Sequence, residues 1–325
     1  MKRGDNMHKL YFFAKKDLQN TERVLEKVLI SENLVLNHAI QELLKAGGKR
    51  IRPLLVLICG YFSQKVPKNL SEVAATLEMI HMSSLVHDDV IDAAPVRRGV
   101  PTVYAQYGTK TSMYCGDFIF GRAIMLLSSI RNIHLDCILA KTIKAVCLGE
   151  IDQIRDKYDF DQSFRTYLRR IKRKTAILLS ASCEMGACAA GASADIVWHV
   201  KMFGYYLGMS YQIIDDILDF TGDERTIGKP AGDDLRQGNI TLPVLYALKY
   251  CPELSEEICS VSEDMPKAKL QPILEKICKS GGIEYAYQVS DSYYKLARAQ
   301  WEFLPDGSAK DALWFIAQKI RKRNK

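Results

Sequence analysis

The sequence carries one acidic pattern twice, as Asp88-Asp89-Val-Ile-Asp92 and as Asp215-Asp216-Ile-Leu-Asp219. On an α-helix, residues four apart lie on one face and about 6 Å apart along the axis. The first and last aspartates of each copy would therefore point the same way, where like charges repel and do not stabilise a helix. Carboxylate oxygens are ligands that Mg²⁺ prefers, and protein-bound Mg²⁺ commonly bridges to phosphate oxygens. The duplicated pattern predicts two groups of Mg²⁺ ligands.

A single copy of this pattern is also common on solvated helices, where it has no function. Here each copy ends an apolar run, residues 79–86 in the first case and 205–214 in the second. Carboxylates in apolar surroundings normally pair with a cation or bind a metal. The surroundings therefore favour metal binding over a solvated helix face.

Several cationic residues suit a phosphate-bearing substrate. Residues 47–53 read Gly-Gly-Lys-Arg-Ile-Arg-Pro, a glycine turn followed by three cations, and Arg97-Arg98 follows the first acidic pattern. Guanidinium groups bind phosphate in a bidentate manner. A solvated helix junction is an equally good interpretation of residues 47–53 alone. His81 lies two helical turns before Asp88 and would face the same way, although a lone helix histidine is more often a core residue.

The bulk composition fits a globular protein. The 325 residues are 48% hydrophobic and 26% charged, which is enough for one large domain or two ordinary ones. The net charge is +7, with the densest cationic cluster at residues 165–174. Cations that lie near acidic patterns fit a small anionic substrate better than a nucleic-acid groove, and no nucleic-acid recognition motif is present.

The nine cysteines include no C-x-x-C pair and are odd in number, which is typical of a reducing, cytoplasmic setting. The first ten residues lack a long apolar segment, so we expect no signal peptide. No stretch of about 18 uninterrupted apolar residues occurs, so we expect no membrane span.

Helical periodicity dominates the chain. Phe203, Leu207, Tyr211, Ile214 and Leu218 form one apolar stripe at spacings of three and four. Glycine and proline separate long segments, and alternating strand patterns are nearly absent. The sequence predicts an all-α protein, a large helical bundle whose site is built between facing helices. We expect a single domain over residues 1–325, with residues 1–9 as a loose N-terminal extension.

Taken together and in order, these motifs resemble the trans-isoprenyl (polyprenyl) diphosphate synthase family. The motifs are G-G-K-R-x-R-P at 47–53, H-D-D-V-I-D at 87–92 with R-R-G at 97–99, K-T at 174–175, Y-Q-I-I-D-D-I-L-D-F at 211–220 and G-K-P-A-G-D-D-L at 228–235. The resemblance extends from about residue 10 to the end of the chain. The sequence around the motifs is similar to that of the catalytic component of bacterial heptaprenyl diphosphate synthases.

The resemblance implies an isoprenoid-synthase-like helical fold around a deep central cavity. It also implies a Mg²⁺-dependent prenyltransferase that joins an allylic diphosphate to isopentenyl diphosphate, head to tail, and releases pyrophosphate. The family's metal ligands correspond to Asp88, Asp92, Asp215 and Asp219. Its catalytic residues correspond to Asp88, Asp89, Asp92, Lys174, Asp215 and Asp216. Its isopentenyl-diphosphate contacts correspond to Lys49, Arg52, His81 and Arg98. Its allylic-diphosphate contacts correspond to Arg97, Lys174, Thr175, Gln212 and Lys229.

Product length is expected to depend on the residues one turn before the first acidic pattern. Ser83 and Ser84 are small, where short-chain members tend to place an aromatic residue. We therefore expect an all-trans product of about C30 to C50 for quinone side chains, with heptaprenyl as the best choice by resemblance. The alternative is a packing role, in which small residues at these positions let neighbouring helices approach each other closely. In one departure from the family, Asn239 stands where many shorter-chain members have lysine, which leaves the role of that position open.

The alternatives are a short-chain (geranylgeranyl or farnesyl) diphosphate synthase and, less favoured, a class I terpene cyclase. A cyclase would not need a second set of cations at Lys49 and Arg52, and its second metal motif usually reads differently. A non-catalytic partner subunit would tend to lose its acidic patterns. The resemblance also implies either a homodimer or a heterodimer with a small non-catalytic subunit, and it allows transient membrane contact when the product is released.

Overall fold

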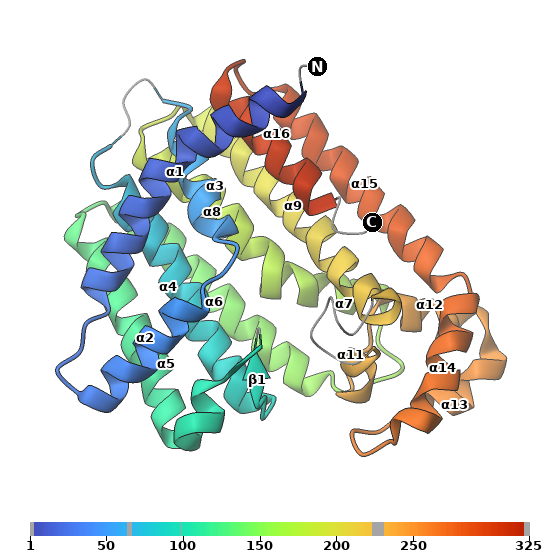
Figure 1. Ribbon diagram of the computed structural model, residues 1–325. Coiled ribbons are helices and arrows are strands. Elements are labelled where there is room, and N and C mark those ends of the chain that lie inside the picture. Colours follow the sequence, from blue (N-terminus) through green and yellow to red (C-terminus); the bar gives the residue numbers. More distant parts are fainter. Residues whose placement is uncertain (1–2, 64–66, 98, 223–230, 322–325) are drawn as a thin grey trace. The chain divides into compact units, whose positions relative to one another are not determined.

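Helices form almost all of the regular structure in the described part of the chain (Figure 1). The computed structural model describes residues 3–63, 67–97, 99–222 and 231–321, with side chains from residue 15 onward. Within these ranges the only strands are β1 (Val96–Arg97) and β2 (Val100–Pro101), which pair antiparallel with Val96 opposite Pro101. The prediction of an all-α protein is confirmed. No described helix is both long enough and apolar enough to cross a membrane.

Contacts divide the chain into two compact units. Unit 1 comprises Met1–Lys141, Ala181–Lys201 and Leu304–Leu313. Unit 2 comprises Thr142–Ser180, Met202–Phe303 and Trp314–Lys325. The single domain over residues 1–325 stays a prediction. Four of the five boundaries fall within helices, which are α6 (Ile133–Arg155), α8 (Ile177–Ala189), α9 (Ala194–Thr221) and α16 (Ser308–Arg321). The fifth, between residues 303 and 304, lies outside any helix.

Unit 1 is organised around the helix that carries the first acidic motif. That helix packs along its neighbour in sequence, so that α4 and α5 lie side by side (Figure 1). At Gly116 of α5 an added Cβ would overlap Nε2 of His87, so the His87 ring lies directly against the backbone of α5. The helices that lie wholly in unit 1 are α1 (Arg3–Val28), α2 (Leu34–Ala46), α3 (Ile51–Gly60), α4 (Leu70–Ile91) and α5 (Val103–Ser129).

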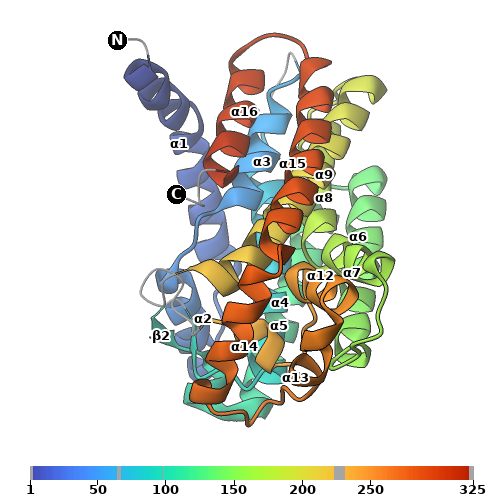
Figure 2. The ribbon, with the colours of Figure 1, turned by 90° about the vertical axis from the view of Figure 1, so that its right-hand side faces the viewer.

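Unit 2 has its own apolar core, in which Tyr167, Ile213, Ile217 and Leu235 are fully buried. Helices α12 and α14 lie against α15 (Figure 2). One π-helical turn (Lys172–Ala176) continues α7. The other elements that lie wholly in unit 2 are α7 (Phe164–Ile171), α11 (Asp233–Arg236), α12 (Leu242–Tyr250), the 3₁₀ turn Pro252–Leu254, α13 (Ser255–Cys259), α14 (Lys267–Lys279) and α15 (Gly282–Glu302).

Local sequence explains several helix starts. The side chains of Asn33, Thr102 and Ser163 accept hydrogen bonds from backbone N–H groups three residues ahead, at 3.0, 3.0 and 3.1 Å. These N-caps satisfy donors that a helix leaves open at its first turn, and each typically stabilises a helix by about 1 kcal/mol. The caps fix where α2, α5 and α7 begin.

Candidate active site

The first acidic motif lies at the C-terminal end of α4. The helix ends at Ile91, and Asp92 is its C-cap, with the Asp92 N–H donating to the carbonyl oxygen of Asp88 at 2.8 Å. The last turn contains no basic residue. Carboxylates are disfavoured at a helix C-terminus, because the macrodipole is negative there. The end of α4 is therefore a place that favours a bound cation.

The three aspartates of this motif have different surroundings. Asp89 is buried, at 3% exposure, and one of its oxygens accepts a hydrogen bond from Nε of Arg97 at 2.6 Å. Asp88 and Asp92 are half-buried. Arg97 reaches Asp89 from β1, so the short hairpin orients this end of α4. The ion pair gives Arg97 a second role besides the predicted contact with the allylic diphosphate.

A small pocket of about 50 Å³ lies beside this end of α4, within unit 1. Its polar lining includes His81 and Arg97, which were both predicted to contact diphosphate, and also Asp89, Arg50 and Glu78. Leu43, Met82 and Leu85 contribute apolar walls. The pocket combines charged groups, which pair with one another, with an apolar wall.

Arg50 is the residue of this region that the sequence did not single out. Its Nε donates to Glu22 at 2.6 Å and its Nη1 donates to Glu78 at 2.7 Å. Burial lowers the pKa of Arg50, but the hydrogen bonds and charges of Glu22 and Glu78 outweigh it, and the net change is upward. The backbone of Arg50 is left-handed, with φ of 48°, which is uncommon for a residue with a side chain. Arg50 therefore holds the connection between α2 and α3 in place.

Lys49 and Arg52 lie on either side of this anchor. Lys49 is exposed in the connection before α3, and Arg52 is half-buried in the first turn of α3. Neither lines the small pocket. Arg98, the fourth predicted isopentenyl-diphosphate contact, lies outside the described residues. Of the described members of this predicted set, only His81 lines the pocket, and the roles of Lys49 and Arg52 stay predictions.

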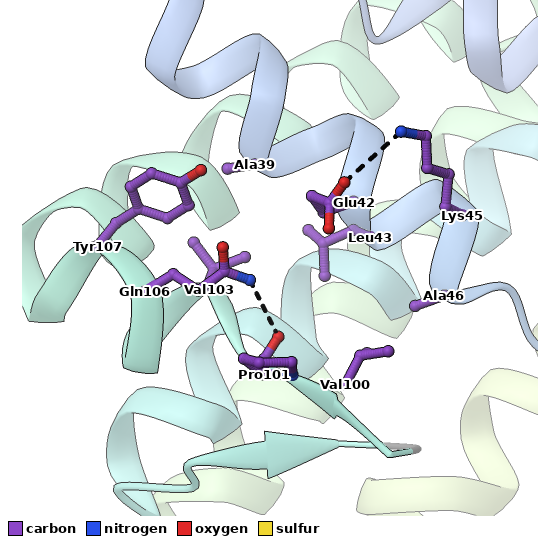
Figure 3. Close-up of a pocket in the computed structure, with 10 residues that line it drawn as sticks. All are labelled: Ala39, Glu42, Leu43, Lys45, Ala46, Val100, Pro101, Val103, Gln106 and Tyr107. Carbon is purple, nitrogen blue, oxygen red and sulfur yellow. Dashed lines mark hydrogen bonds and ion pairs between the residues drawn. The ribbon is translucent and has the colours of Figure 1, made fainter.

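A larger cavity of about 150 Å³ lies next to the small pocket, between α2 and the start of α5 (Figure 3). The two share Leu43, Ala46, Val100 and Pro101. Its polar groups are already engaged, since Lys45 pairs with Glu42 at 3.6 Å and Gln106 donates to the carbonyl oxygen of Pro101 at 3.3 Å. No residue predicted for the site lines this cavity, so it is not the candidate site.

Ser83 and Ser84, the predicted chain-length residues, point to different partners. The Ser83 hydroxyl is buried and donates to the carbonyl oxygen of Gly116 on α5 at 2.9 Å. The Ser84 hydroxyl is half-buried and donates to the carbonyl oxygen of His81 in its own helix. Ser83 therefore helps to pack α4 against α5, which agrees with the alternative of a packing role. A role in product length stays a prediction for both.

The second acidic motif lies in the last turns of α9, which also contain no basic residue. Asp215 is exposed, Asp216 is 4% exposed and Asp219 is half-buried. Asp216 accepts one hydrogen bond from the Tyr167 hydroxyl at 2.7 Å and another from Nε2 of Gln212 at 2.8 Å. Both oxygens of Asp216 are thus used inside unit 2. As in the first motif, the inner aspartate is buried and held by protein groups.

Burial shifts the titration of this motif. It raises the pKa of Asp216 to about 7, with the charge of Asp234 adding to the rise and the bonds from Gln212 and Tyr167 opposing it. Burial and the charge of Asp234 also raise the pKa of Asp219 to about 9. One oxygen of Asp219 accepts a hydrogen bond from the backbone N–H of Asp234 at 3.3 Å. Close carboxylates of this kind are stabilised by a cation.

The π-helical turn brings two more predicted residues to this motif. Thr175 donates to Oε1 of Gln212 at 2.5 Å, and Lys174 donates to Oε1 of Gln153 at 2.8 Å. π-Helical turns inside α-helices are rare and frequent at functional sites. Unit 2 therefore links Thr175, through Gln212, to the inner aspartate of the second motif, and Lys174 lies next to Thr175 in the same turn. Lys229, the last predicted allylic-diphosphate contact, lies outside the described residues.

Asn239, where the sequence departs from the shorter-chain pattern, is buried at 9% exposure in unit 2. Its Oδ1 has no hydrogen-bond partner among the described residues. The backbone N–H of Asn239 donates to the carbonyl oxygen of Asp234 at 2.8 Å. The structure therefore places this residue beside the segment that also binds Asp219.

Both motifs fit Mg²⁺ by the chemistry of their donors. Among the described residues, no three histidine, cysteine or acidic side chains are grouped closely enough to hold a metal alone. Mg²⁺ does not need such a cage, because it is usually bound by one or two carboxylates together with substrate phosphates and water. Half-buried and exposed carboxylates at cation-favouring helix ends meet that requirement.

The comparison with known proteins decides the family. The profile described as polyprenyl synthetase matches residues 33–277, which is most of the chain. The chain belongs to the polyprenyl synthetase family. It is 49% identical over 313 residues to heptaprenyl diphosphate synthase component 2 of Bacillus subtilis (strain 168), covering 96% of this chain and 90% of that protein. This polyprenyl synthetase is therefore a prenyltransferase enzyme.

Solved structures support the same assignment. Heptaprenyl diphosphate synthase from Staphylococcus aureus matches with a TM-score of 0.92 and 36% identity, covering 96% of this chain and 98% of that one. A polyprenyl synthase from Caulobacter crescentus CB15, complexed with calcium and isoprenyl diphosphate, matches with a TM-score of 0.91 and 30% identity, covering 98% of each chain. The helical fold implied by the sequence motifs is confirmed for this polyprenyl synthetase.

Proposed function

We propose that this polyprenyl synthetase adds isopentenyl diphosphate units to an allylic diphosphate and makes an all-trans long-chain polyprenyl diphosphate, with heptaprenyl diphosphate as the main product. The observation that carries the proposal is the pair of D-D-x-x-D motifs at two helix ends that favour cations. The 49% identity to a heptaprenyl diphosphate synthase component supports the choice of product length. The small residues at Ser83 and Ser84 agree with a long product.

Asp88 and Asp92, with Asp215 and Asp219, are proposed as the oxygen ligands of Mg²⁺ on the allylic diphosphate. When bound, Mg²⁺ neutralises the leaving pyrophosphate and so makes ionisation of the allylic C–O bond feasible. The relative that was solved with calcium and isoprenyl diphosphate supports a divalent cation in this role. Asp89 and Asp216 are proposed to act by holding their motifs in position.

The remaining residues are proposed to bind the two diphosphates and exclude water. Lys174, Thr175 and Gln212, with Arg97 and Lys229, would face the allylic diphosphate. His81, with Lys49, Arg52 and Arg98, would face isopentenyl diphosphate. The apolar residues around both motifs exclude water, which would otherwise convert an allylic cation into an alcohol.

A partner subunit is also proposed. The Bacillus subtilis relative is named component 2, which implies that it works with a further component. We propose either a heterodimer with a small non-catalytic subunit or a homodimer. None of the nine cysteines forms a disulfide, which supports action in a reducing cytoplasm. We further propose that the product serves quinone side chains such as those of menaquinone, and that its release involves transient contact with a membrane.

The test is an assay of product length. Purified protein would be incubated with Mg²⁺, farnesyl diphosphate and labelled isopentenyl diphosphate, alone and with a co-expressed candidate partner. We expect acid-extractable products of about C30 to C50 with C35 dominant, and none when Mg²⁺ is chelated. Products that stop at C15 or C20 would indicate a short-chain synthase, and cyclic hydrocarbons would indicate a terpene cyclase. No turnover under either condition would contradict the proposal.

A further inference from the structure

A chain of three hydrogen bonds links four side chains of unit 2. Tyr167 donates to Oδ2 of Asp216 at 2.7 Å, Gln212 donates to Oδ1 of Asp216 at 2.8 Å, and Thr175 donates to Oε1 of Gln212 at 2.5 Å. We call these four residues the relay. Its direction is fixed, because the Gln212 amide must turn its oxygen to Thr175 and its nitrogen to Asp216. Turning the amide over would set its oxygen against the Asp216 carboxylate and break the bond between them.

The relay is shielded from solvent. Tyr167 is fully buried, Asp216 is 4% exposed and Thr175 is 6% exposed. A buried carboxylate that lacked its donors would be costly, so Tyr167 and Gln212 determine how Asp216 is oriented. Burial and the charge of Asp216 raise the pKa of Tyr167 well above its ordinary value, so the phenol stays a donor throughout the working range of pH.

Tyr167 is itself held from its other side. The guanidinium carbon of Arg170 lies 5.7 Å from the centre of the Tyr167 ring. Arg170 in turn donates to Oε1 of Gln162 at 3.0 Å and to the carbonyl oxygen of Ile240 at 2.5 Å. These contacts hold the Tyr167 side chain in place at one end of the relay.

At its far end the relay enters the π-helical turn. Glycines on two neighbouring helices pack directly against this turn. A Cβ added at Gly208 of α9 would lie 2.5 Å from Cα of Ala176, and one added at Gly149 of α6 would lie 2.7 Å from Cβ of Arg173. Such close approaches leave the turn little room to move. Thr175 lies in this turn next to Lys174, so the relay connects the second acidic motif to the backbone that carries that lysine.

We infer that Tyr167 is a positioning residue for the allylic-diphosphate half of the reaction: through Asp216 and Gln212 it fixes the π-helical turn that presents Lys174. This inference rests on the proposed function. It assigns to a buried tyrosine, in the core of unit 2, control over residues that would contact the substrate.

The test compares Tyr167→Phe with Tyr285→Phe in the assay that supports turnover of the unaltered protein. Tyr285 is a matched control, because its ring lies 6.5 Å from Phe164, which stacks on Tyr167 at 6.4 Å, and it takes no part in the relay. We expect Tyr167→Phe to lower kcat/KM for the allylic diphosphate by about 10- to 100-fold, the usual effect of losing a hydrogen bond to a charged group. KM for isopentenyl diphosphate should change by less than about twofold, and Tyr285→Phe should match the unaltered protein.

A second pair of variants tests the far end of the relay without altering Tyr167. Thr175→Val removes the hydroxyl and should show the same difference between the two substrates, whereas Thr175→Ser restores the hydroxyl and should restore most of the activity. The double variant with Tyr167→Phe should lose less than the product of the two single losses, because both changes break one network.

The outcomes separate this inference from the proposed function. If the unaltered protein makes no polyprenyl diphosphate, the proposed function fails. If it does, then a Tyr167→Phe variant with unaltered kcat/KM, or with equal changes in KM for both substrates, overturns the inference. Should Tyr167→Phe fail to fold, the Thr175 pair decides: equal activity of the Val and Ser variants overturns the inference.

Discussion

The two acidic motifs share one pattern, but their inner aspartates are held by different chemistry. Asp89 accepts a hydrogen bond from a cation, Arg97, whereas Asp216 accepts hydrogen bonds from the neutral groups of Tyr167 and Gln212. A neighbouring guanidinium favours the ionised form of a buried carboxylate, and neutral donors compensate less of the cost of burial. Burial and the charge of Asp234 raise the pKa of Asp216 to about 7, against the hydrogen bonds from Gln212 and Tyr167.

The comparison indicates that the position of an aspartate within the D-D-x-x-D pattern determines its role. The neighbouring side chains determine which groups hold it in place. In both motifs the inner aspartate is buried and serves the scaffold, and the outer aspartates lie at helix ends where the macrodipole favours a cation. Unit 1 uses arginines for the scaffold, at Arg97 and again at Arg50. Unit 2 uses a relay of neutral donors.

The largest expected effect comes from the outer aspartates. Asp88→Asn and Asp215→Asn should each lower kcat by about 10²- to 10³-fold, because each removes a charge that would hold the cation on the leaving group. The free energy of unfolding should change by less than about 1 kcal/mol. Steady-state kinetics with a urea unfolding curve measures both, with the exposed Asp161→Asn as the control. Unchanged kcat in Asp215→Asn would show that this residue is not a metal ligand.

The inner aspartates should differ from each other in stability. Asp89→Asn leaves Arg97 without its carboxylate and should destabilise the protein by about 2 kcal/mol. Asp216→Asn keeps neutral partners around a neutral side chain and should cost less than about 1 kcal/mol at pH 8, because the burial of a charge is avoided. Urea unfolding of both variants in metal-free buffer makes the comparison. Equal losses would contradict the distinction drawn between the two units.

The raised pKa values predict how stability depends on pH. In the folded state Asp216 and Asp219 keep their protons up to about pH 7 and about pH 9, whereas in the unfolded chain they ionise near the ordinary value of 3.8. Between pH 3.8 and these raised pKa values, unfolding releases the two protons. The stability that the protonated Asp216 and Asp219 contribute is therefore full below about pH 4 and is lost as pH rises.

The range from pH 6 to pH 9 spans the two raised pKa values, and a variant that lacks both carboxyl groups isolates their effect. The metal-free protein should lose stability by up to about 1.4 kcal/mol per pH unit for each proton released. The variant with both Asp216→Asn and Asp219→Asn should show a flatter dependence. Thermal unfolding at a series of pH values checks this, and parallel curves for the two proteins would count against the raised pKa values.

The smallest effect on rate is expected at the two serines of α4, which also differ in role. Ser84→Phe should shorten the product by at least one isoprene unit with little change in kcat for the first condensation. Ser83→Ala should leave product length unchanged and cost about 1 kcal/mol, because it removes the hydrogen bond to Gly116. Chromatography of the dephosphorylated products resolves the chain lengths. An unchanged distribution in Ser84→Phe would show that the growing chain does not pass this residue.

The helical fold could be predicted because its signals are local. Apolar stripes such as the one through Phe203 and Leu207 act within a few residues and were readable from the sequence. The acidic motifs were readable for the same reason. Their spacing of four, by itself, places the outer aspartates on one helix face.

The partners of the site residues could not be predicted, because they come from distant parts of the chain. Arg50 stands between Lys49 and Arg52, and nothing local distinguishes it from them; only Glu22 and Glu78 make it the buried one. Tyr167 was likewise one aromatic residue in a cationic segment until Asp216 was placed beside it. The π-helical turn has no sequence signature of its own and depends on the glycines that pack against it.

The central proposal is that the outer aspartates of both motifs bind the divalent cations that neutralise the allylic diphosphate. The direct measurement is the number of Mn²⁺ ions bound per chain, by electron paramagnetic resonance, in the presence of an unreactive sulfur-bridged analogue of farnesyl diphosphate. The account predicts that Asp88→Asn and Asp215→Asn each reduce the Mn²⁺ bound with the analogue, and that Asp161→Asn does not. Full Mn²⁺ binding in either the Asp88→Asn or the Asp215→Asn variant would contradict it.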